Sequence, residues 1–175
     1  FAIAKHLDSE DIAGGMILAL CVLGIGANPL IVHHGVGATP VLNLLLYAYG
    51  VPAVIGLFFA RKLKAMGLKE LSVVVRITAL LLLFLLVSLE VRQAFHGNFL
   101  DGPSPTNAEW YAYSAAWILF GAALLIAGIL TGGASARYAS LVVLLGAAAK
   151  VFLFDTRELR DLYRVFSFLG LGASL

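Results

Sequence analysis

The feature that most constrains this chain is a set of five apolar stretches, each long enough to cross a lipid bilayer. A helix that spans the hydrocarbon core needs about 20 mostly apolar residues. Uninterrupted apolarity, without period-two alternation, distinguishes such helices from the strands of a membrane barrel. The sequence therefore predicts an all-α, polytopic transmembrane helical bundle with five complete spans and the start of a sixth. The predicted spans are residues 12–28, 41–60, 71–89, 111–130 and 138–154, and the sixth begins near Tyr163.

Composition places the chain in the lipid bilayer and excludes several other classes. Hydrophobic residues make up 61% of the chain and charged residues only 13%, whereas soluble domains carry about 25% charged residues. The net charge of +2 and the lack of a basic stripe argue against a nucleic-acid partner. One cysteine excludes an intrachain disulfide and a thiol-based metal cage. The sequence holds no P-loop, dinucleotide or serine-hydrolase fingerprint, so we predict no cofactor.

The chain begins with Phe1 and stops inside an apolar run. We therefore expect a single transmembrane domain, residues 1–175, cut from a longer protein whose remaining transmembrane segments would be its partners. The positive-inside rule assigns the loop richest in Lys and Arg to the cytoplasm. With alternating spans, six basic residues fall on one side and four on the other. The six predicted cytoplasmic residues are Lys5, Arg61, Lys62, Lys64, Lys69 and Arg137.

Proline and glycine mark special points within these spans. Pro52 lies in the middle of the second span, where neighbouring helices can satisfy the freed carbonyl, so we predict a kinked helix. Gly128-x-x-x-Gly132 matches a close-packing motif of membrane helices, although Gly132 also stands where the helix should stop. The loop 93–109 is rich in Gly, Pro and Asn, which predicts an irregular outer cap that is ordered or partly ordered.

Lys150 is the main indication of a functional site. It lies 12 residues past Tyr138, about 18 Å into a hydrocarbon core of roughly 30 Å. A charge at that depth is costly and usually marks a partner, a cavity or a function. We predict an outward-facing polar pocket around it. The candidate residues of this pocket are Lys150, Glu90, Asp155, Arg164, Arg92, Tyr113 and Ser114.

Helix geometry favours one partner for Lys150 over another. Residues 150 and 155 are about 140° apart around a helix, so Asp155 lies on a different face. Glu90, or a carboxylate from another helix, is then the better partner. Two structural interpretations remain open: an ion pair that only fixes packing, or a lysine that extends its ammonium toward the interface. A ligand site or a proton pathway is the functional alternative.

The polar linker and the histidines are further candidate binding groups. Residues 155–164 have the layout of a short interfacial helix with its charges in water. Alternatively, Arg160 and Arg164 could grip a phosphate or carboxylate headgroup, because arginine presents a bidentate fork. His33, His34 and His96 lack the spacing of metal ligands, so we predict no metal site.

Several motifs resemble one protein family. They are Arg-Tyr-Ala-Ser-Leu from Arg137, Lys-Val-Phe-Leu-Phe-Asp from Lys150, Tyr-Arg-Val-Phe-Ser-Phe-Leu-Gly-Leu-Gly from Tyr163, and Tyr-Ala-Tyr-Ser from Tyr111. Together they resemble the C-terminal portion of the bacterial membrane-protein family called domain of unknown function 2339. The resemblance implies a bacterial inner (cytoplasmic) membrane location and transfers no catalytic residue.

Three classes of function stay open from the sequence. The first is a binding or transport-like module with its pocket around Lys150, acting on an anionic or lipid-linked small molecule. The second is a membrane enzyme that acts on a lipid-linked or cell-envelope substrate, with Ser114 and Lys150 as the only conceivable nucleophile and base. The third is a structural scaffold subunit.

Overall fold

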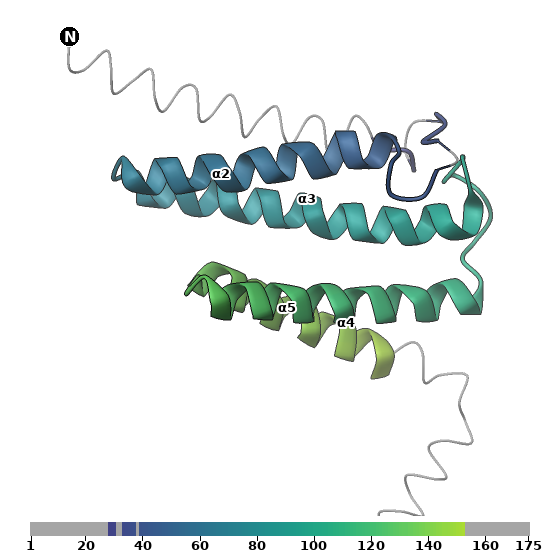
Figure 1. Ribbon diagram of the computed structural model, residues 1–175. Helices are drawn as coiled ribbons and strands as arrows, with labels where there is room; N and C mark the ends of the chain where they lie inside the picture. The colour runs from purple at the N-terminus through teal and green to yellow at the C-terminus, as the bar shows by residue number, and fades with distance from the viewer. Residues whose placement is uncertain (1–27, 31–32, 38, 153–175) are drawn as a thin grey trace, which may run out of the picture. The chain divides into compact units, whose positions relative to one another are not determined.

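The computed structural model describes residues 28–30, 33–37 and 39–152, and its regular elements there are all helical (Figure 1). This confirms the predicted all-α class for the described part of the chain. Three segments are long and apolar enough to cross a membrane, namely Leu46–Ala65, Lys69–His96 and Asn107–Leu130. The first and sixth predicted spans lie almost wholly outside the described residues. The fifth, 138–154, runs past residue 152, and α5 is not among the three candidate spans. The count of five spans therefore stays a prediction. The elements are η1 (Leu46–Gly50), α2 (Val51–Ala65), α3 (Lys69–His96), α4 (Asn107–Leu130) and α5 (Ala134–Lys150).

Contacts divide the chain into two compact units, Phe1–Ser104 and Pro105–Leu175. The single transmembrane domain stays a prediction. In the first unit α2 packs along α3, and in the second α4 packs along α5. The described part of each unit therefore contains one antiparallel helix pair.

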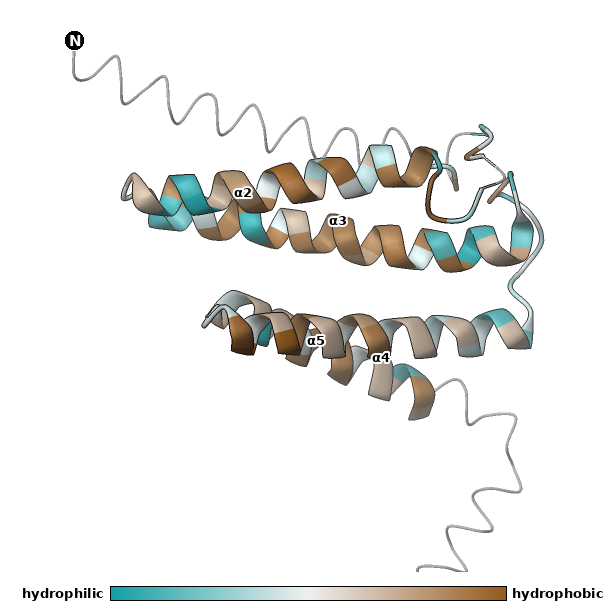
Figure 2. Ribbon diagram, viewed as in Figure 1, coloured by the Kyte–Doolittle hydropathy of each residue, from teal (hydrophilic) through white to brown (hydrophobic). Residues whose placement is uncertain are grey.

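The helix α3 is longer than the span predicted at 71–89. Its 28 residues extend about 42 Å, which exceeds a hydrocarbon core of about 30 Å. The extra turns are polar: Lys69 and Glu70 open the helix, while Arg92 and Gln93 lie near its end. Figure 2 shows the apolar residues along the middle of α3 and hydrophilic ones toward its ends. The predicted loop 93–109 is accordingly shorter, because α3 runs to His96 and α4 begins at Asn107.

Pro52 is accommodated by a local change of helix type. It lies in the first turn of α2, and the five residues before α2 form the π-helix η1. A proline inside a helix has no N–H to donate and its ring crowds the carbonyl four residues earlier. A π-helical turn inserts an extra residue into the helical hydrogen-bond pattern and relieves the clash between the ring and the carbonyl. The structure thus places a π turn directly ahead of Pro52, and the predicted kink stays a prediction.

The basic residues predicted in a loop are mostly helical. Arg61, Lys62 and Lys64 belong to the last turns of α2, where cations interact favourably with the helix dipole. The connection itself is only residues 66–68, and Gly67 has a φ of 89°, a conformation that glycine adopts without strain. This short turn fixes α2 against α3, and buried Ala60, Leu63 and Val75 form the core beside it.

Glycine lets α4 approach α5 closely. A Cβ placed on Gly128 would lie 2.9 Å from the backbone N of Arg137, and one on Gly121 would lie 2.8 Å from the Leu144 side chain. The two contact points are seven residues apart on both helices, which is the repeat of closely packed helices. Gly132, with a φ of 64°, belongs to the turn between the helices. The Gly128-x-x-x-Gly132 motif therefore combines one close helix contact with one turn residue.

We expect Gly128→Ala to destabilise the second unit by about 1–3 kcal/mol, the usual range for overpacking. The new methyl group would meet backbone, which cannot move aside as a side chain can. Unfolding of the purified protein in mixed micelles measures the loss. The matched control is Gly146→Ala in α5, where a Cβ would meet nothing within 4 Å. Equal stability of the two variants would contradict the close contact at Gly128.

Candidate functional site

The N-terminal turn of α4 is built by a capping interaction. Thr106 has extended backbone angles, and its side chain accepts a hydrogen bond from the backbone N of Glu109 at 3.3 Å. Thr106-x-x-Glu109 has the spacing of a capping box, which marks a helix start. Because α4 begins at Asn107, Glu109 becomes part of the helix and is fully buried. A residue that the sequence analysis left in a loop is therefore a buried acid.

Lys150 lies against this same end of α4. Its Nζ donates hydrogen bonds to the backbone O of Trp110 at 2.8 Å and to Ser114 Oγ at 2.7 Å. Nζ also lies 5.1 Å from the centroid of the Trp110 ring, within the range of a cation–π interaction. Lys150 is only 7% exposed and Ser114 5%. The ammonium thus contacts two oxygen atoms and one aromatic face of α4.

Tyr113 links the buried acid to the same turn of α4. Its hydroxyl donates to Glu109 Oε1 at 3.1 Å, and its ring lies between those of Trp110 and Trp117, with centroids 6.3 Å and 6.4 Å away. The Glu109–Tyr113 pair has the i,i+4 spacing that brings helix side chains together. We name the set Glu109, Trp110, Tyr113, Ser114 and Lys150 the α4/α5 polar cluster.

The electrostatics of the cluster suit a positive charge at its centre. A carbonyl oxygen and the negative face of an indole ring both attract cations. Burial makes any unpaired charge costly. Within the described residues, every buried side-chain nitrogen or oxygen has a hydrogen-bond partner. The cluster therefore holds its buried charges without leaving a polar atom unsatisfied.

The register of the helix hairpin explains why Lys150 meets Ser114. From the turn at Gly132, residues pair across the two helices at matching distances: Gly128 with Arg137, Gly121 with Leu144, and Ser114 with Lys150. The cluster is the next contact point after the two glycine contacts. It lies near the start of α4, because Ser114 follows Asn107 by about 10 Å along the helix axis.

Glu90, the partner predicted for Lys150, has other contacts. Its carboxylate accepts hydrogen bonds from the backbone N of Val41 at 3.2 Å and from Asn43 Nδ2 at 2.8 Å. Gln93 continues this network by donating to the backbone O of Gly37 at 2.7 Å. Glu90 thus anchors the segment before η1 onto α3. The Lys150–Glu90 pair stays a prediction, and these contacts do not favour it.

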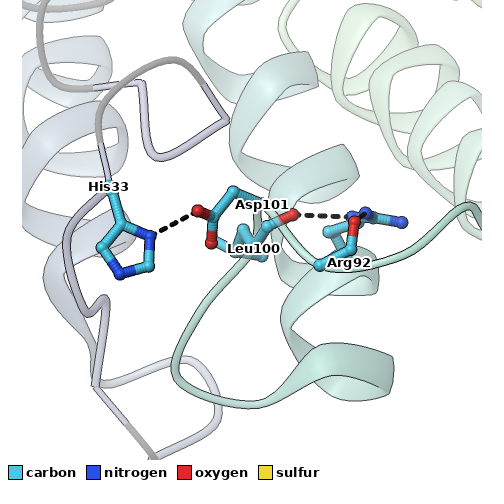
Figure 3. A network of polar contacts seen from close by, with 5 residues as sticks. His33, Arg92, Leu100 and Asp101 are labelled. Carbon is cyan, nitrogen blue, oxygen red and sulfur yellow. Dashed lines mark hydrogen bonds and ion pairs between the residues drawn. The ribbon is translucent and has the colours of Figure 1, made fainter.

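Arg92 organises the loop that follows α3. Figure 3 shows its guanidinium beside the backbone O of Leu100, to which Nε donates at 3.0 Å. One terminal nitrogen donates to the backbone O of Gly102 at 3.0 Å and of Pro103 at 2.9 Å. A buried guanidinium that binds three carbonyls of one loop fixes that loop's shape. This supports the ordered cap expected from the loop composition.

At the surface of this loop, His33 donates a hydrogen bond to Asp101 (Figure 3). The His33 ring also stacks on Phe99, with ring centroids 5.0 Å apart. The hydrogen bond from His33 holds the pKa of Asp101 below its usual value. A lowered carboxyl pKa stabilises the fold at pH values above the unfolded pKa, and the benefit is lost as pH falls through the folded pKa. Among the described residues, no three His, Cys, Asp or Glu side chains gather as metal ligands.

The structure brings together only some of the predicted site residues. Lys150, Ser114 and Tyr113 meet in the α4/α5 polar cluster, while Glu90 and Arg92 belong to the cap of the first unit. Asp155 and Arg164 lie outside the described residues. Sequence reasoning missed Glu109 and Trp110 as members of the cluster. The Thr106-x-x-Glu109 capping signature was the available signal for Glu109.

Long apolar helices with a buried polar cluster define a polytopic helical membrane protein. The chain belongs to the family described as Predicted membrane protein (DUF2339), whose model matches residues 8–175. This confirms the family that the sequence motifs resemble. The family description specifies a membrane protein and names no activity. Neither a curated protein nor a solved structure matches the chain.

We expect Arg92→Lys to loosen the loop 97–103 and to lower stability by about 1–3 kcal/mol, because one ammonium cannot replace the guanidinium fork. Hydrogen–deuterium exchange of that loop and unfolding of the purified protein measure the two effects. Arg61→Lys, on the exposed surface of α2, is the control and should change neither. Unaltered exchange in Arg92→Lys would show that the loop is held by other contacts.

Proposed function

We propose that this chain is a binding or transport-like membrane module and that the α4/α5 polar cluster is its site. One observation carries the proposal: the buried ammonium of Lys150 lies within hydrogen-bond distance of Ser114 Oγ and the Trp110 carbonyl. Ionisable groups inside membrane helices are expensive and mark substrate or ion pathways by default. A buried ionisable side chain with polar partners is therefore the best candidate for a binding site.

A purely structural role explains the cluster less well. The α4–α5 pair already packs through close contacts at Gly121 and Gly128. Replacing a buried charged group and its partners by apolar residues of similar volume is often neutral or stabilising. A scaffold would therefore gain nothing from Lys150 that leucine or methionine could not provide. Retaining a buried ammonium is better explained by a use for its charge.

The ligand chemistry suggested by the contacts differs from the sequence expectation. An anionic or lipid-linked ligand would need cationic donors directed toward it. The described hydrogen bonds of Lys150 and Arg92 go to oxygen atoms of the protein itself. The contacts therefore support a site that attracts positive charge.

Topology supports an outward-facing position for the site. If the basic residues around the α2–α3 turn are cytoplasmic, α3 crosses the membrane and the loop 97–106 lies outside. The start of α4, and the cluster with it, is then at the outer side. A bacterial inner membrane, with the remaining transmembrane segments of the full-length protein as neighbours, is the setting that we propose.

A membrane enzyme is the second candidate, favoured by the 2.7 Å distance between Lys150 Nζ and Ser114 Oγ. A nucleophile within hydrogen-bond reach of a base that a third group orients is the expected catalytic arrangement. However, Ser114 is in the interior of α4, where the backbone N–H groups already form helix hydrogen bonds, so they cannot serve as an oxyanion hole. A covalent fluorophosphonate adduct at Ser114 that requires Lys150 would identify the enzyme.

A transport-like site must open to water, so we expect a cysteine at position 114 to react with a small water-soluble thiol reagent. The test uses Ser114→Cys in a Cys21→Ala background, reconstituted into liposomes and treated with aminoethyl methanethiosulfonate. Ala147→Cys is the matched control, because Ala147 is fully buried one turn before Lys150 in α5. Ser104→Cys, in the exposed loop, gives the rate for an open position.

Position 114 should react much faster than position 147 and more slowly than position 104. A cysteine at 114 that reacts no faster than one at 147 would mean a sealed cluster. That result would favour the structural scaffold over the binding or transport-like module.

A further inference from the structure

We infer that the N-terminal turns of α4 form a binding site for a small monovalent cation, and that the Lys150 ammonium is its tethered occupant. The inference rests on the proposed location of the site and adds the sign of the charge that it binds. The α4 part of the site consists of the Trp110 carbonyl and ring, Ser114 Oγ and the buried turn that carries Glu109.

The hydrogen-bond directions define what these α4 groups offer. An ammonium has three donors and no acceptor, so both of its oxygen partners must accept. The distances of 2.8 Å to the Trp110 O and 2.7 Å to Ser114 Oγ are those of good N–H···O bonds. A backbone carbonyl can only accept. The Trp110 oxygen would therefore repel an anion in the same position.

The aromatic face adds to the same preference. Nζ lies 5.1 Å from the Trp110 ring centroid, and the face of an indole is the best aromatic partner for a cation. Such faces, together with oxygen atoms, are how proteins recognise ammonium ligands. Glu109 is buried in the adjoining position of α4 and accepts a hydrogen bond from Tyr113. Four groups of one helix segment thus favour positive charge over negative.

Removing the tether should leave a site that a free cation can fill. Lys150→Ala deletes the side chain beyond Cβ, and n-propylammonium supplies the missing atoms. The measurement is the thermal stability of the purified full-length protein in detergent. Solutions of n-propylammonium, tetramethylammonium, sodium and sodium propionate are compared at equal ionic strength. Tetramethylammonium carries the same charge but has no N–H donor, and propionate tests for an anion site.

We expect n-propylammonium to restore the Tm of Lys150→Ala in a saturable manner, whereas tetramethylammonium, sodium chloride and propionate should not. Lys150→Met fills the space and should not respond to the amine. Adding Ser114→Ala to Lys150→Ala should raise the half-saturating concentration about tenfold, as expected for one hydrogen bond to a charged group. An equal response to all salts, a response of Lys150→Met, or stabilisation by propionate would overturn the cation site.

If Lys150→Ala does not fold alone, it is purified in n-propylammonium, and withdrawal of the amine should then unfold it. A second measurement tests the inference if Lys150→Ala does not fold even in the presence of the amine. Two proteins are compared, Ser114→Cys alone and Ser114→Cys combined with Lys150→Met. Each is labelled with cationic aminoethyl methanethiosulfonate and with anionic sulfonatoethyl methanethiosulfonate. Loss of the ammonium should increase the cationic-to-anionic rate ratio at position 114 more than at Ser104→Cys. An equal increase at both positions would reflect net charge alone and would contradict the inference.

The two proposals fail in different ways. If Ser114→Cys does not react with thiol reagents but n-propylammonium stabilises Lys150→Ala, the cluster is a cation site without a transport-like role. If Ser114→Cys reacts readily but propionate stabilises Lys150→Ala, the cluster is a water-accessible site for anions.

Discussion

A buried ammonium group needs oxygen atoms around it, because burial removes most of the water that would otherwise solvate it. In the second unit this requirement is met by the first two turns of α4. The Trp110 carbonyl, Ser114 Oγ and the indole ring enclose Nζ. The capped start of α4 at Thr106 brings Glu109 into the same region. The helix pair can approach closely enough for these contacts because Gly121 and Gly128 carry no side chain at the interface.

The first unit meets a similar requirement in a different way. There Arg92 and Glu90 lie near the end of α3, and their hydrogen bonds go to the loop 97–103 and to the segment before η1. Bonds to local backbone carbonyls and amides fix chain segments in place. Lys150 instead bonds to oxygen atoms of α4, the helix packed along its own. The charges of the cap therefore hold irregular segments against α3, whereas the ammonium of Lys150 links the two helices of one pair.

The sequence predicted helical spans well because a membrane leaves few ways to satisfy backbone hydrogen bonds. It placed helix ends less well: polar turns at Lys69 and Glu109 continue helices that apolarity alone would end. Pro52 indicated a local disturbance, but the π-helical form of η1 depends on how the chain relieves the clash. Helix angles argue against Asp155 as the partner of Lys150 but cannot select among residues of neighbouring helices, so the sequence names Ser114 as a pocket residue and favours Glu90 as the partner. The short turn at residues 131–133 indicates which residue of the neighbouring helix lies opposite Lys150. It makes α4 and α5 antiparallel neighbours and places Ser114 opposite Lys150.

The central claim, that Lys150 is coupled to α4, is tested most directly by two double-mutant cycles of unfolding free energy in mixed micelles. One cycle combines Lys150→Met with Ser114→Ala, and the other combines Lys150→Met with Glu90→Leu. We predict a coupling energy of about 1 kcal/mol for the first pair. The second cycle tests the predicted Lys150–Glu90 pair independently. Additive effects for Lys150 and Ser114 would contradict the account.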